Sequence, residues 1–417
     1  MSGVRELRCV LCGDGHAPDA LEYVCPDCGE VGTLDVLYDY PRLRAQLDRD
    51  ALLAPRAEGM WRWRALLPLA AEDRVPPLPV GDTPLLPAPY LARDLGLRAL
   101  WLKDEGRNPT ASLKDRASAM VAARALRGGR GVVSTASTGN AAAALAGVCA
   151  TLPELDAIIF VPAGAPEAKI AQLMVYGARV LLLDGSYDLA FELCFRLSQE
   201  EGWYCRNTGI NPYTSEGKKT AAFEMAAQLG WRMPDAVVVS VGDGSIIGGL
   251  HKGFRELRLL GWTEREPRLI GVQAEGSSAL VQAAREGTGA AAMRAQEAST
   301  IADSISAGLP RDRAKALRAV QQSNGAWVSV PDEAILAAIP RLAQASGVFA
   351  EPAAAAALAG LESAIARGQL SRDSSVALLV TGNGLKDVAT AGRSVGAAQR
   401  VPPDANAIRR ALQERAA

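Results

Sequence analysis

The sequence predicts an α/β fold of two open, mostly parallel sheets, preceded by a small cysteine-rich segment. Short apolar stretches alternate with alanine-rich helical stretches along most of the chain, which is typical of parallel sheets covered by helices. The length of 417 residues exceeds one minimal domain and suggests two domains. Four of the seven cysteines lie at or before Cys28, which sets the N-terminal segment apart from the rest.

Two pairs of cysteines in this segment have the spacing of a zinc ribbon. Cys9-x-x-Cys12 and Cys25-x-x-Cys28 are separated by twelve residues, and a glycine follows each second cysteine, where a tight turn is needed. Four thiolates complete a tetrahedral shell without water, so the expected Zn²⁺ is structural. A ribbon of this size buries too little surface to fold without metal. The alternative, four thiols without metal, is seldom seen for paired knuckles.

The body of the chain contains seven apolar segments of strand length. In open parallel sheets, ligands bind beyond the carboxyl ends of the strands, so the loops after these segments are where a site is expected. The expected strands lie at 100–103, 131–135, 157–161, 179–183, 236–241, 269–274 and 376–381.

The loop after the first of these strands contains a lysine at an unusual position. Segment 108–116 reads Asn-Pro-Thr-Ala-Ser-Leu-Lys-Asp-Arg and leads into an expected helix through 117–127, with Ser112 as the expected N-cap. Lys114 then faces the positive end of the helix dipole, which disfavours its ammonium form and leaves the amine free to form an imine. This loop alone favours a catalytic lysine and a solvated surface lysine equally.

Two further loops at strand ends are suited to binding anions. Residues 137–139 precede an expected helix, whose first backbone N–H groups can bind the carboxylate of an amino acid. Segment 241–249, Val-Gly-Asp-Gly-Ser-Ile-Ile-Gly-Gly, also precedes a helix, and its backbone can wrap a phosphate. Each pattern is weak by itself, because a cap and turn would explain the first and a nucleotide site or tight turn the second.

Taken together, these segments resemble the threonine synthases of the fold-type II enzymes that depend on pyridoxal phosphate. Segment 108–116 is similar to the family motif Asn-Pro-Thr-Gly-Ser-Phe-Lys-Asp-Arg, and 381–387 to its Thr-Gly-Asn-Gly-Leu-Lys-Asp segment. The likeness runs in order from 81 to 387. Ala111 and Leu113 depart from the motif by replacing glycine and phenylalanine, and the glycine loop lacks the family's usual Asn-Ala-Gly-Asn.

The resemblance implies a site for pyridoxal 5'-phosphate. Lys114 matches the family lysine that forms the Schiff base with the cofactor, and Asn140 matches the asparagine that lies against its phenolic oxygen. Thr381 matches the residue that hydrogen-bonds the pyridine nitrogen. A hydroxyl does not lock that nitrogen in its protonated form, so the ring is a milder electron sink, which favours elimination and replacement over transamination.

The other site residues follow from the same likeness and from the charges the substrate requires. The cofactor phosphate is expected to be held by Gly242, Asp243, Gly244, Ser245 and Ile246. The substrate carboxylate is expected to be held by Ser137, Thr138 and Gly139. The candidates for binding a leaving phosphate are Lys218, Lys219 and Thr220. A solvated charged turn would explain these last three residues equally well.

The expected domain division places the cofactor in the larger of two domains. Residues 1–35 form the zinc-ribbon-like segment, and residues 36–118 and 215–417 form the large α/β domain that binds pyridoxal phosphate. Residues 119–214 form a smaller, mobile α/β domain. These boundaries are approximate.

The reaction implied by the resemblance is elimination of phosphate from O-phosphohomoserine, followed by addition of water at Cβ to give threonine. Lys114 would take protons from Cα and Cβ in turn. The departures from the family motifs leave open a related enzyme that performs β-replacement or β-elimination on phosphoserine, serine or threonine, as in cysteate synthesis or dehydration. Each reaction uses a small amino acid, and we expect a homo-oligomer, a dimer.

Composition narrows the partners and the location. The 45 basic and 46 acidic residues are well mixed, so no electrostatic footprint indicates a nucleic acid or an anionic membrane. No segment approaches the roughly 20 apolar residues that span a bilayer, so we expect a cytoplasmic protein. The histidines His16 and His251 do not adjoin a candidate serine or cysteine nucleophile, which argues against a triad hydrolase.

Overall fold

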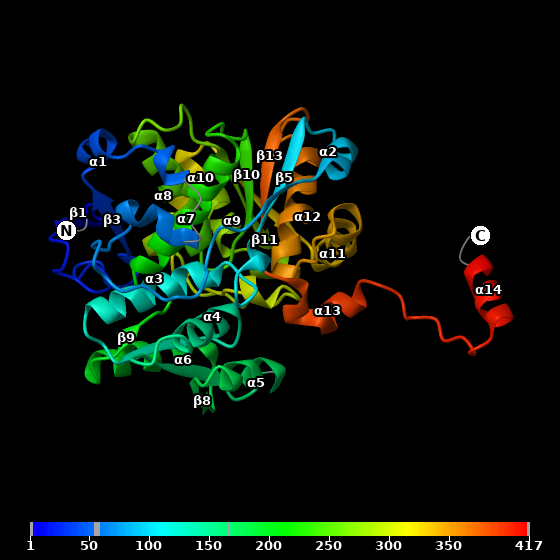
Figure 1. The fold of residues 1–417 in the computed structure, drawn as a ribbon, viewed down its shortest axis with the longest axis horizontal. Coiled ribbons are helices and arrows are strands. Elements are labelled where there is room, and N and C mark those ends of the chain that lie inside the picture. Colours follow the sequence, from blue (N-terminus) through cyan, green and yellow to red (C-terminus); the bar gives the residue numbers. More distant parts are fainter. Residues whose placement is uncertain (1–2, 54–58, 166, 415–417) are drawn as a thin grey trace.

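The computed structural model describes residues 3–53, 59–165 and 167–414, which contain three sheets (Figure 1). The first is a small antiparallel sheet near the N-terminus with the strand order β2-β1-β3. Its strands are β1 (Val4–Cys9), β2 (Gly15–His16) and β3 (Leu34–Tyr38). Cys9 ends β1, the other three paired cysteines lie in the segments between these strands, and helix α1 (Tyr40–Gln46) follows the sheet.

The second sheet has six strands in the order β12-β11-β10-β13-β5-β4. All neighbours are parallel except β4, which runs antiparallel to β5 at one edge. The strands are β4 (Leu85–Pro87), β5 (Ala99–Asp104), β10 (Ala236–Ser240), β11 (Arg268–Ala274), β12 (Ala326–Val330) and β13 (Ser375–Val380). The predicted mostly parallel α/β sheet is therefore confirmed.

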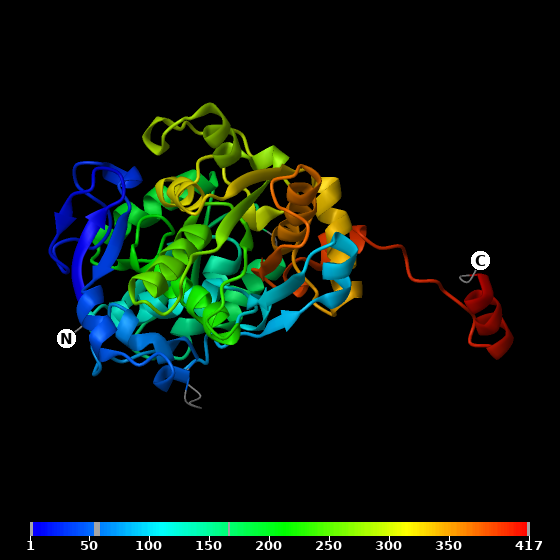
Figure 2. The same ribbon diagram turned by 90° about the horizontal axis from the view of Figure 1, so that it is seen from above.

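Helices cover both faces of this sheet (Figures 1 and 2). Val237 and Val239 of β10 belong to the core on one face, whereas Ala236 and Val238 belong to the core on the other. Both sets are apolar because both faces are buried, as is usual for parallel sheets. One face packs on α7 (Tyr213–Gln228), α8 (Ser245–Leu259) and α10 (Arg313–Gln322), and the other on α11 (Asp332–Ser346) and α12 (Pro352–Ala366).

The third sheet is entirely parallel, with four strands in the order β8-β7-β6-β9. Its strands are β6 (Val132–Ala136), β7 (Asp156–Pro162), β8 (Arg179–Leu183) and β9 (Tyr204–Cys205). Its helices are α4 (Asn140–Cys149), α5 (Glu167–Val175) and α6 (Tyr187–Glu200). The four strands fall within 119–214, the range expected for the smaller domain. The domain boundaries themselves stay a prediction, and the outermost boundary residues, 1 and 417, lie outside the described residues.

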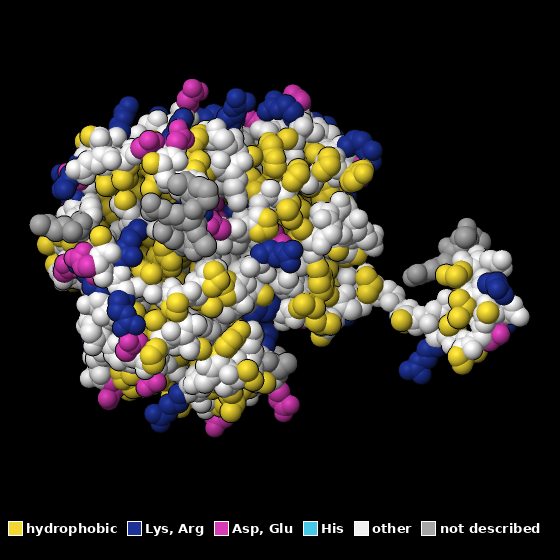
Figure 3. Space-filling model, in the orientation of Figure 1, with side chains coloured by type: hydrophobic (Ala, Val, Ile, Leu, Met, Phe, Trp, Pro, Cys, Tyr) yellow, Lys and Arg dark blue, Asp and Glu magenta, His cyan; other side chains and the backbone are white. Residues whose placement is uncertain are grey.

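The C-terminal helix stands apart from the body of the molecule. Figures 1 and 2 place the N-terminal sheet at one end and helix α14 at the opposite end, beyond an extended segment. Figure 3 shows hydrophobic side chains on α14, whose Ile408 and Leu412 are exposed. The helices not yet placed are α2 (Pro89–Leu95), α3 (Lys114–Arg127), α9 (Ala279–Glu286), α13 (Val388–Arg393) and α14 (Ala405–Glu414). Within the described ranges, none of the helices has the length and apolar character to cross a membrane.

A buried ion network joins β5, α3 and α7. The Arg116 guanidinium lies 2.7 Å from a Glu105 carboxylate oxygen and 2.6 Å from one of Glu224. Lys103 lies 2.7 Å from the other oxygen of Glu224. All four side chains are at most 2% exposed. Since Arg116 follows Lys114 by two residues, the network holds the first turn of α3 in place.

We predict that Arg116→Met strongly destabilises the protein. The variant leaves the carboxylates of Glu105 and Glu224 buried without their main cation, which costs about 3–5 kcal/mol of unfolding free energy. Urea unfolding followed by circular dichroism would show the lower midpoint. Arg127→Met is the matched control, because its pair with Asp73 is partly exposed and should contribute about 1 kcal/mol or less. Equal midpoints for the two variants would contradict the role given to the network.

Candidate active site

Loops at the carboxyl ends of the parallel strands of the six-stranded and four-stranded sheets surround two cavities that share Lys114. The glycine-loop cavity, of about 50 Å³, is lined by Lys114, Thr381 and residues 241–247. The central cavity, of about 430 Å³, is lined by Lys114, residues 135–141 and Arg206. The strand-end loops selected from the sequence therefore lie around one lysine.

Lys114 is the first residue of α3. Its backbone N–H donates to the Ser112 hydroxyl at 3.3 Å, although the N-cap position belongs to Leu113 and not to Ser112 as expected. The Leu113 N–H donates to the carbonyl of Thr381 at 2.9 Å, which ties the loop to the end of β13. Burial lowers the pKa of Lys114; Glu351 opposes this and Arg206 adds to it. A lowered pKa increases the fraction of uncharged amine.

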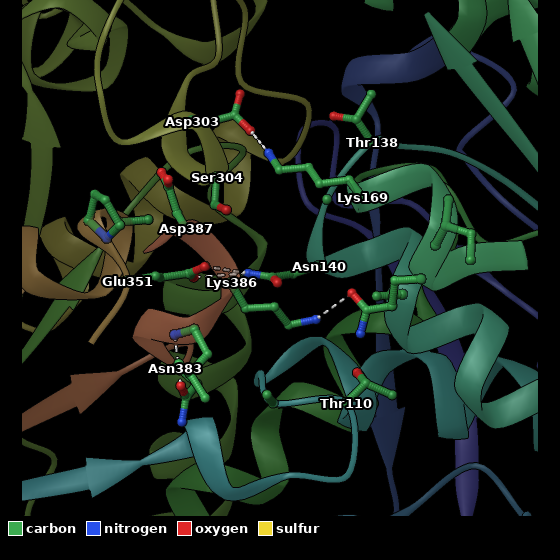
Figure 4. A pocket seen from close by; sticks show the side chains of 18 of the residues that line it. Thr110, Thr138, Asn140, Lys169, Asp303, Ser304, Glu351, Asn383, Lys386 and Asp387 are labelled. Carbon is green, nitrogen blue, oxygen red and sulfur yellow. Dashed lines mark hydrogen bonds and ion pairs between the residues drawn. The ribbon is translucent and has the colours of Figure 1, made fainter. Parts of the chain in front are cut away.

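Asn140 is held by a carboxylate that the sequence did not suggest. It is the first residue of α4, and its Nδ2 donates to both carboxylate oxygens of Glu351, at 2.9 Å each (Figure 4). Both residues line a lateral cavity of about 420 Å³, with Lys169 and Lys386 also on its wall. Burial raises the pKa of Glu351. Glu351 comes just before an alanine-rich helix, where the sequence resembles any helix start, so no signal singled it out.

The glycine loop between β10 and α8 has the shape and charge of an anion site. Gly244 has φ +91°, and a Cβ there would lie 2.6 Å from the Ala316 Cβ, so only glycine fits. Helix α8 begins at Ser245, whose hydroxyl accepts from the Lys218 ammonium at 2.5 Å. Among the described residues, Lys218 has no carboxylate within 4 Å. Backbone N–H groups at a helix start, a cation and a hydroxyl together fit a phosphate.

The three other predicted residues of this loop, Gly242, Asp243 and Ile246, also lie on the cavity wall. Asp243 points its carboxylate at the backbone N–H of Arg311, 3.1 Å away, and burial raises the pKa of this carboxyl. Ile246 lines the same cavity. Thr381 follows β13 on the wall near Lys114. Ser137, Thr138 and Gly139 line the central cavity just before α4.

Lys219 and Thr220 are not brought to any of the three cavities. Successive residues of α7 point in different directions, so only Lys218 of the three reaches the glycine loop. The Lys219 ammonium lies 2.6 Å from a Glu216 oxygen and 2.8 Å from one of Glu256. The Thr220 hydroxyl donates to the Gly217 carbonyl. Both side chains are occupied within the protein interior.

The central cavity also contains Arg206, which was not selected from the sequence. Arg206 directly follows β9, a strand of two residues. So short a strand leaves no apolar run in the sequence, and the rule that ligands bind at strand ends could not be applied to it.

The four N-terminal cysteines converge at a point that is not on the wall of any of these cavities. Their Sγ atoms all lie within 4.8 Å of one another, and those of Cys12 and Cys25 are 3.9 Å apart. Four sulfurs at about 2.3 Å from one zinc ion would be separated by about 3.8 Å. Gly13 and Gly29 have φ +85° and +61°, as the predicted turns require. This donor set fits a structural zinc ion.

Ala111, one of the departures from the family motif, is in the left-handed region with φ +66°. Glycine adopts this conformation freely, which explains the glycine of the motif. The Ala111 carbonyl accepts from the Asn383 N–H at 3.0 Å, so the strained residue links the lysine loop to the segment after Thr381. The chain keeps the conformation at the cost of a crowded Cβ.

Comparison with known sequences identifies relatives along nearly the whole chain. The family described as "Pyridoxal-phosphate dependent enzyme" matches residues 77–382. The threonine synthase of Methanosarcina acetivorans is 39% identical over 388 residues, which cover 92% of this chain and 93% of the relative. The threonine synthase of Methanocaldococcus jannaschii is 37% identical over 414 residues, covering 98% and 99%.

Solved structures share the fold. The processed form of threonine deaminase isoform 2 from Solanum lycopersicum aligns with a TM-score of 0.65 at 23% identity, covering 75% of this chain and 87% of that one. Diaminopropionate ammonia lyase from Escherichia coli aligns with a TM-score of 0.64 at 20% identity, covering 78% and 88%. At these identities the likeness establishes the fold alone.

We predict that Ala111→Gly stabilises the protein. Relief of the left-handed strain gains about 1–2 kcal/mol, and the greater freedom of glycine in the unfolded chain offsets about 0.5–1 kcal/mol. The net gain of up to about 1 kcal/mol would appear as a higher urea midpoint. The control is Ala125→Gly inside α3, which should lower the midpoint because glycine costs about 1 kcal/mol there. A loss of stability in both variants would show that Ala111 is not strained.

Proposed function

Because the chain belongs to the family of pyridoxal-phosphate-dependent enzymes, we propose that it is a threonine synthase that converts O-phosphohomoserine and water to threonine and phosphate. The observation that carries this proposal is the grouping of Lys114, the glycine loop and Thr381 around one cavity, with Asn140 on the adjoining wall. Relatives that bear this name cover nearly all of the chain, which supports the choice of reaction.

The cofactor would be held by residues whose geometry fits it. Gly242, Asp243, Gly244, Ser245 and Ile246 would bind its phosphate, with Lys218 supplying a positive charge. Asn140 would lie against its phenolic oxygen and Thr381 against its pyridine nitrogen. When bound, the cofactor withdraws electrons from the bonds at the substrate Cα, which makes the proton there acidic.

Lys114 would move the protons of the reaction. Its lowered pKa provides an uncharged amine that can accept the Cα proton and, after it has released that proton, can accept a Cβ proton. Ser137, Thr138 and Gly139 would orient the substrate by holding its carboxylate at the start of α4. Glu351 would fix the side-chain amide of Asn140 in one orientation through their two contacts.

The same residues could serve β-replacement or β-elimination on phosphoserine, serine or threonine, which is the alternative function. The grouping of Lys114 and the glycine loop does not separate these reactions, because they share proton removal from Cα. The names of the relatives favour threonine synthase. A direct comparison of substrates decides between the two.

We propose that Cys9, Cys12, Cys25 and Cys28 bind one structural zinc ion.

We also propose that the chain is divided into a zinc-ribbon-like segment at 1–35, a large domain made of 36–118 and 215–417, and a smaller mobile domain at 119–214. The exposed pair of Lys169 and Asp303, 2.6 Å apart, would open if that part moved. A homodimer located in the cytoplasm is also proposed, and solution mass and cell fractionation would test it.

We predict that the purified enzyme releases phosphate from O-phosphohomoserine, with threonine as the product. Phosphoserine, serine and threonine should be poor substrates when phosphate, ammonia and amino-acid products are measured in parallel. Ammonia from serine or threonine as the main product would instead support the alternative function.

Lys114→Ala should lower turnover on the order of 10³-fold, because the variant loses both the proton acceptor and the cofactor linkage. Borohydride reduction followed by peptide mapping should place the pyridoxyl group on Lys114. In the control Lys169→Ala, the label should stay at Lys114. A pyridoxyl group on any other lysine would contradict the assignment.

The zinc proposal predicts one zinc ion per chain in the wild type and none in the Cys25→Ser, Cys28→Ser variant. The variant should become sensitive to protease within residues 9–29, because that segment has lost its metal, while the cofactor absorbance remains. Cys149→Ser, which alters a lone core cysteine, should keep the zinc. Immediate loss of turnover on adding a chelator, with the fold intact, would argue against a structural role.

A further inference from the structure

Arg206 lies beside Lys114 on the wall of the central cavity. Its Nε donates to the Ser118 hydroxyl at 3.2 Å, and its Nη1 to the Thr208 hydroxyl at 3.1 Å. Ser118 follows Lys114 by four residues in α3, so the two project from the same face of the helix. The guanidinium is thereby held next to the side chain of Lys114.

The charge of Arg206 is buried without a counter-ion. The side chain is 1% exposed, and its Nη2 has no hydrogen-bond partner. In the described part of the chain, no carboxylate lies within 4 Å of this guanidinium, whereas the equally buried Arg116 contacts Glu105 and Glu224. Burial lowers the pKa of Arg206 to about 10, which still leaves it charged at neutral pH. An unpaired buried charge is unfavourable unless a bound ligand neutralises it and accepts its hydrogen bonds.

The position of Arg206 indicates which anionic group would pair with its guanidinium. The glycine-loop cavity has its own cation, Lys218, and Arg206 is not on its wall. The central cavity offers the start of α4 for the substrate carboxylate, which leaves the other anionic group of a phosphorylated amino acid for Arg206. The planar guanidinium fork is suited to phosphate oxygens. Thr208 lies on the same wall and adds a hydroxyl.

A second arginine of this cavity differs in its partners. Arg311 also lines the central cavity, but its guanidinium lies 2.5 Å from an Asp188 oxygen and 3.4 Å from one of Glu30. These carboxylates neutralise its charge. Arg311 therefore provides a control that has the same side chain and cavity but a paired charge.

We propose that Arg206 binds the phosphoryl group of the substrate and so selects phosphorylated amino acids over serine and threonine. This inference rests on the proposed function, in which the substrate carries a phosphate. Arg206 would take the place expected from the sequence for Lys218, Lys219 and Thr220. It would also stabilise the negative charge that develops on the leaving phosphate.

The test compares two probes that differ only in the phosphoryl group. 2-Amino-5-phosphonopentanoate has the length of O-phosphohomoserine with a methylene in place of the ester oxygen, and norvaline lacks the phosphonate. Binding to the holoenzyme would be measured by calorimetry and by the change in cofactor absorbance. Arg206→Gln should weaken phosphonate binding by about 30- to 100-fold, and change norvaline binding less than about threefold.

Two further variants sharpen the result. Arg206→Lys keeps the charge but loses the planar guanidinium fork, so phosphonate binding should fall by about five- to tenfold. This variant also tests the proposal if Arg206→Gln does not fold. Arg311→Gln should change phosphonate binding less than about threefold, because its charge is already paired. Equal weakening in Arg206→Gln and Arg311→Gln would overturn the assignment to Arg206.

Three other outcomes would also overturn the assignment to Arg206. The Arg206 variants could bind the phosphonate as tightly as the wild type, they could bind the phosphonate and norvaline with equally reduced affinity, or they could lose the cofactor. The second would assign Arg206 to the carboxylate and the third to the cofactor phosphate. The proposed function is judged separately by wild-type turnover. A wild type that binds the phosphonate through Arg206 but does not convert O-phosphohomoserine would contradict the reaction and leave the binding residue in place.

Discussion

The buried ion network around Arg116 is the interaction on which the site depends. Arg116 lies on α3 with Lys114, Glu105 follows β5, and Glu224 lies on α7 with Lys218. These elements come from distant parts of the sequence, and the network holds them at one end of the six-stranded sheet. A charged network suits this place because a fork of donors fixes both distance and direction, which apolar packing does less well.

The site itself holds charge that is only partly balanced within the protein. Lys218 and Arg206 have no carboxylate within 4 Å among the described residues, whereas Asp243 and Glu351 accept hydrogen bonds from a backbone N–H and a side-chain amide. Positive charge therefore lies on the walls of two adjoining cavities, where anionic ligands would neutralise it. Such an arrangement fits a cofactor and a substrate that each carry a phosphate. The same low-dielectric surroundings lower the pKa of Lys114 and leave its amine available.

Most of the fold could be predicted because parallel strands that are buried on both faces appear in the sequence as continuous apolar segments. All seven expected strands are present, from β5 to β13. In the two larger sheets the prediction missed β4 and β12, edge strands that are only partly buried, and it missed β9, which has two residues. Edge and very short strands have no continuous apolar signal. Their place is decided by pairing with a neighbour, which is a contact between distant residues.

The sequence alone determined the motifs that are local: the lysine loop, the glycine loop, the threonine after β13 and the two cysteine pairs. Each of these works through backbone shape or spacing within a few residues, which a short segment encodes. Only the tertiary structure decided which charged groups face the site. Lys218 turns toward the glycine loop while Lys219 turns toward Glu216 and Glu256. Glu351 and Arg206 come from other elements. The residues that surround a buried charge are determined by the packing of helices and sheets that lie far apart in the chain.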